Sequence, residues 1–357
     1  MRALVIGAGA IGQVFGWHLQ KGGAQVGFLV RPRQLEAARA GYTVYPLNRP
    51  ARDRGKPLPF NGFEVYDDQD VALSKPWDLV VFAMSSVALR SGDWLARFGP
   101  RSGDAAVLVL QPSPEDKEVV LAALPPSRIA TGMLAVVSYQ TPLPGDTLEP
   151  PGVAWWFPWL AGIGFSGADR VVDLVTTALG AGGMPVRRLA DVHTEVAFTG
   201  AILDKTVTAL QVANWSFTAL RSDRALMALA HRSMVESWTL ATATTGQRTP
   251  RHLAFVRPAL LRGILALAGW ILPFDLERFF HYHYVKVQEQ SLLLQDRQLA
   301  RFEAAGIPCP ATRELALRMR AALRQTADQL GATELASRPA SHASATTSST
   351  STETPRP

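Results

Sequence analysis

The opening of this 357-residue sequence constrains its fold more than any other feature. Residues 3–6 read Ala-Leu-Val-Ile, a short apolar run typical of a buried strand, and residues 11–21 have the apolar periodicity of a helix. Between strand and helix lies the spacing G-x-G-x-x-G, made by Gly7, Ala8, Gly9, Ala10, Ile11 and Gly12. This order of strand, glycines and helix predicts a turn that binds the diphosphate of a dinucleotide.

Each glycine of the turn has its own expected role. Gly7 permits the tight turn, Gly9 lets the backbone approach the diphosphate, and Gly12 lets helix and strand pack closely. The first N–H groups of the helix have no partner within it, so they are available to phosphate oxygens. The alternative interpretation is a glycine-rich turn without a ligand.

The end of the second expected strand indicates which dinucleotide is bound. That strand covers residues 25–30 and leads into Arg31-Pro32-Arg33. A site for NAD usually has Asp or Glu here, about 20 residues beyond the glycines, to bind the ribose hydroxyls. A guanidinium at Arg31 instead favours the 2′-phosphate of NADP(H), which it can bind in bidentate fashion. The alternative, a side chain that is simply solvated, applies more to Arg33 than to Arg31.

Short apolar runs and helical periodicity alternate through the first half of the chain. This alternation predicts an α/β fold, in which a doubly wound parallel sheet forms an N-terminal Rossmann domain over residues 1–189. Strands are expected at 3–6, 25–30, 79–82, 106–110, 129–131 and 186–189, and helices at 11–21, 87–98 and 115–123.

The second half has helical periodicity only. An all-helical C-terminal domain is predicted for residues 190–332, where it would bind substrate and form any homodimer. The last residues, 333–357, are rich in Ser, Thr and Pro and cannot form a core, so a disordered tail is expected. The helices of the second domain are expected at 195–220, 223–245, 258–272, 276–305 and 313–330.

Charge and cysteine content indicate which ligands and which cellular compartment to expect. The net charge is +6, but the arginines are spread along the chain and no common nucleic-acid motif is present, so a small anionic molecule is expected rather than nucleic acid. The one cysteine, Cys309, excludes an internal disulfide and favours the cytoplasm. His281 and His283 lack a third ligand at suitable spacing, so we expect no metal site.

The most apolar segment of the second half is 263–272. It is too short to cross a bilayer, and no transmembrane segment is expected. A buried helix is preferred here over a helix that lies on a membrane surface.

At the level of whole motifs, the chain resembles the ketopantoate reductase (2-dehydropantoate 2-reductase) family. The resemblance rests on the opening 1–12 with Arg31, on the order of the two domains, and on 304–310, which are similar to the G-I-x-x-P segment of the family. It covers roughly residues 1–330. It implies reduction of a 2-oxo acid by NADPH, with the active site between the domains.

Several family positions carry different residues here. The catalytic lysine of the family lies in a helix pattern K-L-x-x-N-x-x-x-N, and the only lysine in the matching helix is Lys205, followed by alanines where asparagines are expected. A later glutamate of the family falls on Gln290, a cofactor-contacting lysine on Met84, and an Asn-Gly pair on Gln111-Pro112. The sequence is therefore interpreted as a divergent member with a different substrate.

Two groups of residues are candidates for the chemistry. Lys205 shares a predicted apolar helix face, where it is either desolvated, which would suit a proton donor, or extends its ammonium group to the edge of that face. The rival group is His283, Lys286 and Gln290, whose spacing places them on one face of a single helix. Asn214, nine residues after Lys205, is a weaker candidate for the substrate and lies on the opposite side of an unbroken helix.

Two functions follow from these residues. The first is an NADPH-dependent reductase of a 2-oxo acid or related small ketone. The alternative is a dinucleotide-binding protein that has lost catalysis and serves regulation or scaffolding, because the lysine–asparagine pattern is absent.

Overall fold

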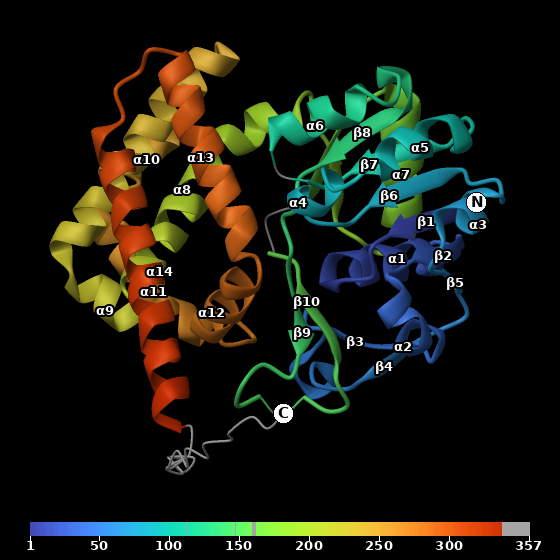
Figure 1. The fold of residues 1–357 in the computed structure, drawn as a ribbon, viewed down its shortest axis with the longest axis horizontal. Helices are drawn as coiled ribbons and strands as arrows, with labels where there is room; N and C mark the ends of the chain where they lie inside the picture. The colour runs from blue at the N-terminus through green and yellow to red at the C-terminus, as the bar shows by residue number, and fades with distance from the viewer. Residues whose placement is uncertain (112, 147, 159–161, 338–357) are drawn as a thin grey trace, which may run out of the picture.

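The first domain is built on an eight-stranded sheet (Figure 1). A computed structural model describes residues 1–111, 113–146, 148–158 and 162–337. All neighbouring strands are parallel except β11, which runs antiparallel to β8. The order across the sheet is β12 (Val186–Arg188), β11 (Ile163–Gly167), β8 (Ile129–Gly132), β7 (Ala106–Val109), β6 (Leu79–Phe82), β1 (Arg2–Ile6), β2 (Gln25–Leu29) and β5 (Glu64–Tyr66).

Helices cover both faces of this sheet, as the alternation of β1 requires. Ala3 and Val5 of β1 belong to one core cluster, and Leu4 and Ile6 belong to another on the opposite face. The first cluster packs against α1 (Ala10–Lys21) and α7 (Asp169–Ala181). The second packs against α3 (Gln69–Leu73), α5 (Trp94–Arg101) and α6 (Pro114–Leu121). Two further short helices of this domain are α2 (Leu35–Arg39) and α4 (Ser86–Leu89).

A second, four-stranded sheet packs against α1 and was not predicted. Its central pair joins residues more than a hundred positions apart in the sequence. The strand order is β4 (Leu58–Phe60), β3 (Tyr42–Pro46), β10 (Gly152–Trp156) and β9 (Val137–Thr141).

The second domain is helical throughout. Its core lies where α8 and α14 pack on α10, and it includes Leu210, Leu229, Met234 and Leu315. The helices are α8 (Val192–Val212), α9 (Phe217–Ser222), α10 (Arg224–Thr245), α11 (Pro258–Ile271), α12 (Leu276–Lys286), α13 (Gln288–Ala304) and α14 (Pro310–Ser337).

The predicted fold class is confirmed, and four predicted helices need correction. The segment 87–98 is two helices, α4 and α5; 195–220 ends at Val212 and resumes as α9; and 276–305 breaks at Val287. The fourth correction is α14, which extends to Ser337, beyond the expected start of the tail at 333; residues 338–357 lie outside the described part. The predicted boundary at 189/190 falls between β12 and α8.

The expectation that 263–272 forms a buried helix was wrong. In α11 only Leu261, Leu265 and Ala268 are buried, whereas Trp270 is 90% exposed. Among the described residues, no single helix is long and apolar enough to cross a membrane.

Candidate cofactor and active site

The glycine-rich turn has the geometry that its sequence predicts. Gly7 has φ +102°, and a Cβ there would lie 3.0 Å from the carbonyl oxygen of Ala83, the residue after β6. A Cβ on Gly12 would lie 1.9 Å from the carbonyl oxygen of Gly7, so the first turn of α1 could not pack on β1 with any side chain there. These two glycines are required by the fold itself.

Gly9 differs, because nothing in the protein requires its lack of a side chain. It is the residue before α1, its φ is −70°, and a Cβ there would meet no atom within 4 Å. The space over Gly9 is therefore open, which is what a diphosphate close to the backbone needs. Ala8, Ala10 and Ile11 complete the turn and first turn of the helix, and no side chain caps the helix N-terminus. The residues present fit a dinucleotide diphosphate.

One polar side chain beneath the turn has an unused acceptor. Gln13 donates from Nε2 to the carbonyl oxygen of Ala8 at 3.0 Å, and this bond fixes the side chain in the turn. Its Oε1 is buried and has no hydrogen-bond partner among the described residues.

Arg31 lies directly after β2, the strand beside the turn. It is exposed and precedes the short 3-10 helix Pro32–Gln34. No hydrogen bond or ion pair joins its guanidinium to the described residues, whereas sixteen ion pairs between other side chains are present there. The guanidinium is thus available to an anion at the end of β2.

Met84 and Gln111 come from the ends of the next two strands and contact each other. Gln111 is buried and donates from Nε2 to the carbonyl oxygens of Met84 at 2.7 Å and Phe82 at 3.1 Å. These bonds cross-link the loops after β6 and β7. Met84 packs on the apolar cluster of the sheet, and Pro112 lies outside the described residues.

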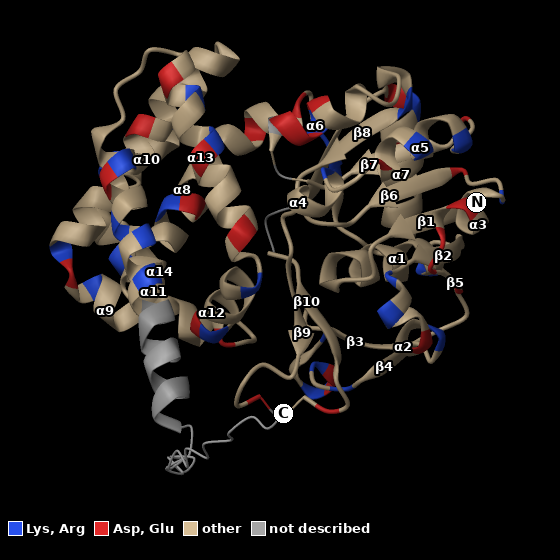
Figure 2. Cartoon of the chain, viewed as in Figure 1, with Lys and Arg blue, Asp and Glu red and all other residues tan. Residues whose placement is uncertain are grey.

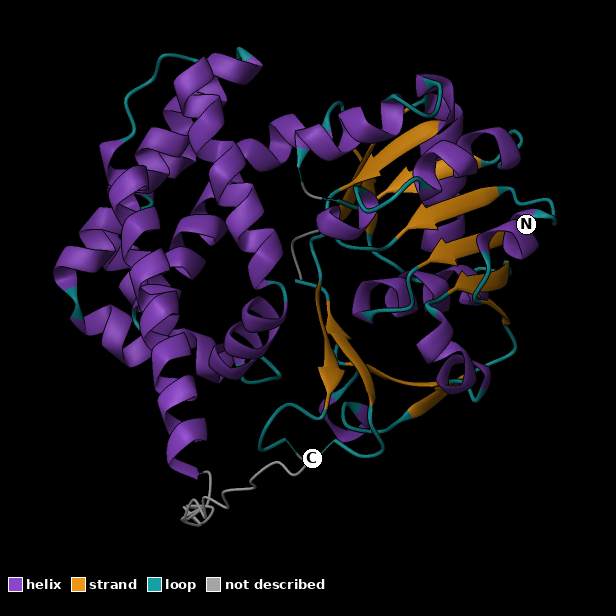
Figure 3. Cartoon of the chain, in the orientation of Figure 1, coloured by secondary structure: helices purple, strands orange, loops and turns teal. Residues whose placement is uncertain are grey.

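The carboxyl ends of the parallel strands point toward the helical domain (Figure 3). Ligands of open α/β sheets bind outside this edge, so the site faces the second domain. Contacts between the domains come from both α13 and α12. Arg301 of α13 lies 3.4 Å from Glu115 of α6, and Lys286 of α12 donates to Gln140 of β9 at 3.2 Å. Phe279 of α12 also packs against Tyr139 of β9.

The contact at α6 contains polar residues that sequence reasoning missed. Asp116 is fully buried, accepts from Ser86 Oγ at 2.7 Å and pairs with Arg90. Acidic residues gather on α6 at this position (Figure 2). The signal that could have found Asp116 is the spacing Ser113-x-x-Asp116, which forms a capping box at the start of α6.

Two arginines of α13 reach toward this group. Burial opposes ionisation of Glu115, but a hydrogen bond from Ser113 and the charges of Arg301 and Arg297 outweigh it, so the pKa of this carboxyl is lowered. His193, near the start of α8, lies beside the same acidic residues; burial lowers its pKa, against the opposing charge of Asp191.

Lys205 is only 2% exposed, so of its two expected placements the structure has the desolvated one. Its Nζ lies 2.7 Å from the carboxylate of Asp204 and donates to Gln298 of α13. Gln298 in turn donates to Ser237 of α10 at 3.3 Å. The ammonium group is therefore engaged within the helical domain.

The rival group does not share one helix face, which corrects the prediction. The helix breaks at Val287, so His283 and Lys286 end α12 whereas Gln290 lies in the first turn of α13. His283 stacks on Phe279, and burial lowers its pKa to about 4. Loss of hydration also lowers the pKa of Lys286. Gln290 is partly exposed.

Asn214 does not lie on the helix of Lys205. Helix α8 ends at Val212, and Asn214 and Trp215 both have left-handed backbone conformations, with φ of 51° and 63°. Asn214 is exposed, whereas Trp215 is buried and stacks on Tyr284. The chain turns here, so the expected helical projection from Lys205 does not apply.

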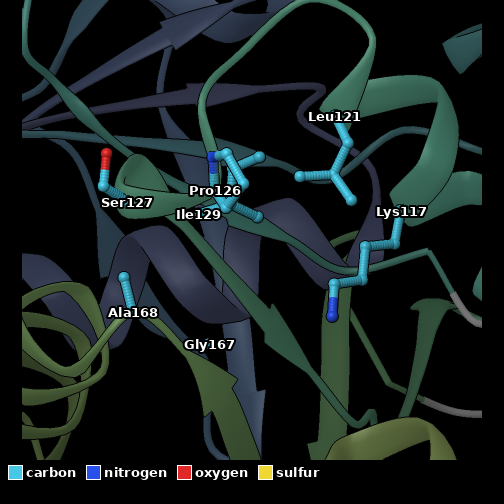
Figure 4. Close-up of a pocket in the computed structure, with 7 residues that line it drawn as sticks. All are labelled: Lys117, Leu121, Pro126, Ser127, Ile129, Gly167 and Ala168. Atoms are coloured by element: carbon cyan, nitrogen blue, oxygen red, sulfur yellow. The ribbon is translucent and has the colours of Figure 1, made fainter.

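A cavity of about 330 Å³ lies elsewhere on the first domain (Figure 4). It adjoins Ile129, where β8 begins, and Gly167, where the antiparallel β11 ends. It is therefore at the opposite edge of the sheet from the glycine-rich turn, and its lining is mostly apolar. The cavity does not belong to the candidate site.

Comparison with known proteins relates this part of the chain to a protein family. Residues 3–146, which include the turn, Arg31, Met84 and Gln111, match the family model described as ketopantoate reductase PanE/ApbA. These residues belong to the ketopantoate reductase family. No curated protein matches the sequence.

Solved structures extend the likeness in fold to both domains. A PanE/ApbA family ketopantoate reductase from Ralstonia eutropha JMP134 has a TM-score of 0.69 at 18% identity, over 91% of this chain and 99% of the other. A 2-dehydropantoate 2-reductase from Geobacter metallireducens GS-15 has 0.67 at 17%, over 90% and 100%. D-mandelate dehydrogenase with NADH and anilino(oxo)acetate has 0.67 at 13%, over 90% and 98%. At these identities the shared property is the fold.

Proposed function

We propose that this protein is an NADPH-dependent reductase of a 2-oxo acid or a related small ketone. The observation that carries the proposal is the open backbone over Gly9, at the N-terminus of α1 and beside a free guanidinium at Arg31. NADPH supplies the hydride for reduction of the ketone. The protein must bind the dinucleotide, bind the substrate and donate a proton to the new hydroxyl group.

The preference for NADPH rests on Arg31. An exposed guanidinium at the end of β2 can form charge-assisted hydrogen bonds with the 2′-phosphate, which NADH lacks. A carboxylate at this position would bind the ribose hydroxyls and repel the phosphate.

The positive charges of α13 favour an acidic substrate. Arg297 and Arg301 lie in the domain contact, beside the edge of the sheet where ligands bind. The solved neighbour bound to anilino(oxo)acetate carries a molecule of the 2-oxo acid class, which supports the same class here.

Lys205 and Lys286 are the two candidates for the proton donor. Lys286 has a pKa lowered by loss of hydration, which brings an ammonium group closer to the value that general-acid catalysis requires. Lys205 is buried but already engaged by Asp204 and Gln298. Gln290 is a third catalytic candidate, and His283 and Asn214 are weaker candidates for substrate binding.

The contacts of Lys205 with Asp204 and Gln298 favour a second function, because they occupy the ammonium group that would donate the proton. If neither lysine donates a proton, the protein binds the dinucleotide without turnover and serves regulation or scaffolding.

The test follows the absorbance of NADPH in the presence of a panel of 2-oxo acids. We expect oxidation with at least one of them, loss of turnover in one of the variants Lys205→Met and Lys286→Met, and retention in the other. Folding of both variants is checked by circular dichroism. Tight binding of NADPH with no oxidation by any substrate would support the second function instead.

We further propose that the protein acts in the cytoplasm, since its one cysteine, Cys309, is unpaired and buried. We also propose that residues 1–189 and 190–332 are the functional domains, and that any homodimer forms through the second.

A further inference from the structure

Helix α11 presents an unusual surface to solvent. It contains fourteen residues, of which Arg262 is the only one with a polar side chain. An ordinary surface helix has charged or polar residues opposite its buried face. In α11 only three residues are buried, so the rest of the helix exposes aliphatic, aromatic and small side chains.

Most of the exposed apolar residues here lie on one face of the helix. Four of them, Leu260, Ile264, Leu267 and Ile271, follow the spacing i, i+4, i+7 and i+11, Trp270 lies one turn beyond Leu267, and Phe255 ends the 3-10 helix that precedes α11. We name this set the α11 face: Phe255, Leu260, Ile264, Leu267, Trp270 and Ile271, of which Trp270 is 90% and Phe255 75% exposed. A contiguous apolar set of this kind marks an interaction surface.

The chain around the α11 face is strongly basic. Residues 206–274 contain seven arginines and two carboxylates, Asp223 and Glu236. Both carboxylates are engaged in capping helices: Asp223 accepts from the backbone of Leu226, and Glu236 accepts from the backbone of Ala311 and Thr312. None of the ion pairs in the described part of the chain involves residues 206–274.

This combination of apolar and basic residues indicates what kind of partner the α11 face binds. In a two-fold contact with a second copy, arginine-rich segments would meet. The carboxylates that follow α11 are already engaged, Asp275 by Arg278 and Glu277 by the backbone N–H of Phe217. A bilayer with anionic headgroups complements both properties, because the apolar side chains enter the boundary of the acyl chains and the arginines contact the headgroups.

The length of α11 determines how it would lie. Fourteen residues span about 21 Å, less than the roughly 30 Å of a hydrocarbon core. The chain then bends by 104° into α12, which packs on the first domain through Phe279. A helix held in this way can lie along a membrane surface but cannot cross it.

We propose that the α11 face attaches this protein to the surface of an anionic lipid bilayer. The attachment is reversible, since one short helix is buried only at the interface. It places the reductase beside the membrane and leaves the glycine-rich turn, on the other domain, free to bind its cofactor.

The test is co-sedimentation of the full chain with vesicles of phosphatidylcholine alone or mixed with phosphatidylglycerol. We expect binding to the mixed vesicles only, weakened by salt. Leu267→Glu should reduce binding by roughly tenfold or more, because it replaces an exposed apolar side chain with a negative charge that the anionic lipid repels. Arg257→Gln, which removes an exposed positive charge, should weaken it by less.

The matched control is Val71→Glu, the same exchange at an exposed position on α3 of the first domain. It should bind vesicles like the unchanged protein, and all variants should bind NADPH equally. Absence of binding to anionic vesicles overturns the proposal. If the chain is then a dimer that Leu267→Glu converts to a monomer, the α11 face binds a second copy instead.

Discussion

At the scale of single residues, the proposed preference for NADPH depends on Arg31. Its guanidinium is exposed at the end of β2 and has no partner among the described residues. The predicted contact of Arg31 with the 2′-phosphate came from its sequence position, because the end of the second strand in a Rossmann domain has a fixed place relative to the glycines. The local geometry of the backbone agrees with the spacing in the sequence.

Arg31→Asp should therefore reverse the cofactor preference. We expect the dissociation constant for NADPH to rise by roughly 10- to 100-fold, because the charge-assisted hydrogen bonds to the 2′-phosphate are lost. The dissociation constant for NADH should change little. Fluorescence titration of both nucleotides measures this. Arg33→Ala is the control, two residues further along, and should have a smaller effect. Equal losses of NADPH affinity in the two variants would show that the 2′-phosphate is attracted by a basic surface as a whole and not bound by Arg31.

His18 gives the fold a dependence on pH. Its Nδ1 donates to the carbonyl oxygen of Gly182 at 2.9 Å, and its ring lies against Trp155 and Phe157. Burial lowers its pKa to about 4, and the charge of Lys21 adds to this. The unfolded chain, with an ordinary histidine pKa of about 6.5, binds the proton more readily than the folded protein does.

The free energy of unfolding should consequently be highest, as far as His18 is concerned, above pH 6.5, and it should fall as the pH drops toward 4. The loss from His18 is on the order of 3 kcal/mol at the lower value. Urea unfolding across this range measures it. His18→Phe should lessen the slope but not remove it, since His283 also has a pKa lowered to about 4 by burial. An unchanged slope in His18→Phe would exclude His18 as a source.

At the scale of elements, different glycines of the glycine-rich turn serve folding and cofactor binding. Gly12 is required by the packing of α1 on β1, because a Cβ would overlap the carbonyl oxygen of Gly7. Gly9 is not required by any protein atom. The same amino acid thus serves two purposes in one motif.

The variants Gly12→Ala and Gly9→Ala should fail in different ways. Gly12→Ala should lose about 1–3 kcal/mol of stability or more, because helix and strand must separate. Gly9→Ala should melt close to the unchanged protein and yet bind NADPH at least about tenfold more weakly, since the new methyl group occupies the place of the diphosphate. Thermal unfolding and nucleotide titration together distinguish the two. Full binding by folded Gly9→Ala would contradict the proposed position of the diphosphate.

Helix ends were the part of the elements that sequence periodicity could not predict. The apolar pattern continues through Val287, where α12 ends and α13 begins, and no glycine or proline marks the break. The same is true after Val212, where Asn214 and Trp215 adopt left-handed conformations without a glycine. The burial of Trp215 against Tyr284 holds this turn, and such a contact is not visible in the local sequence.

At the scale of the whole molecule, the order of the two domains followed directly from the alternation of strands and helices. The second sheet did not, because β3 pairs with β10 from a distant part of the chain. Contacts between the domains, such as that of Glu115 with Arg301, were hidden for the same reason. The candidate site was therefore predicted on its cofactor side and only incompletely on its substrate side.

The α11 face shows a further limit of sequence reasoning at this scale. For the apolar segment between Arg262 and Pro273 the sequence favoured a buried helix, because periodicity alone does not distinguish a core helix from an exposed one. Only the packing of the whole domain shows that most of α11 is exposed.

The central claim is that the glycine-rich turn and Arg31 bind NADP(H). Isothermal titration calorimetry of the full chain with NADPH and, separately, NADH tests it most directly. The account predicts saturable binding of one nucleotide per chain, at least about tenfold tighter for NADPH. Absence of heat with both nucleotides, together with no rise in melting temperature, would contradict it.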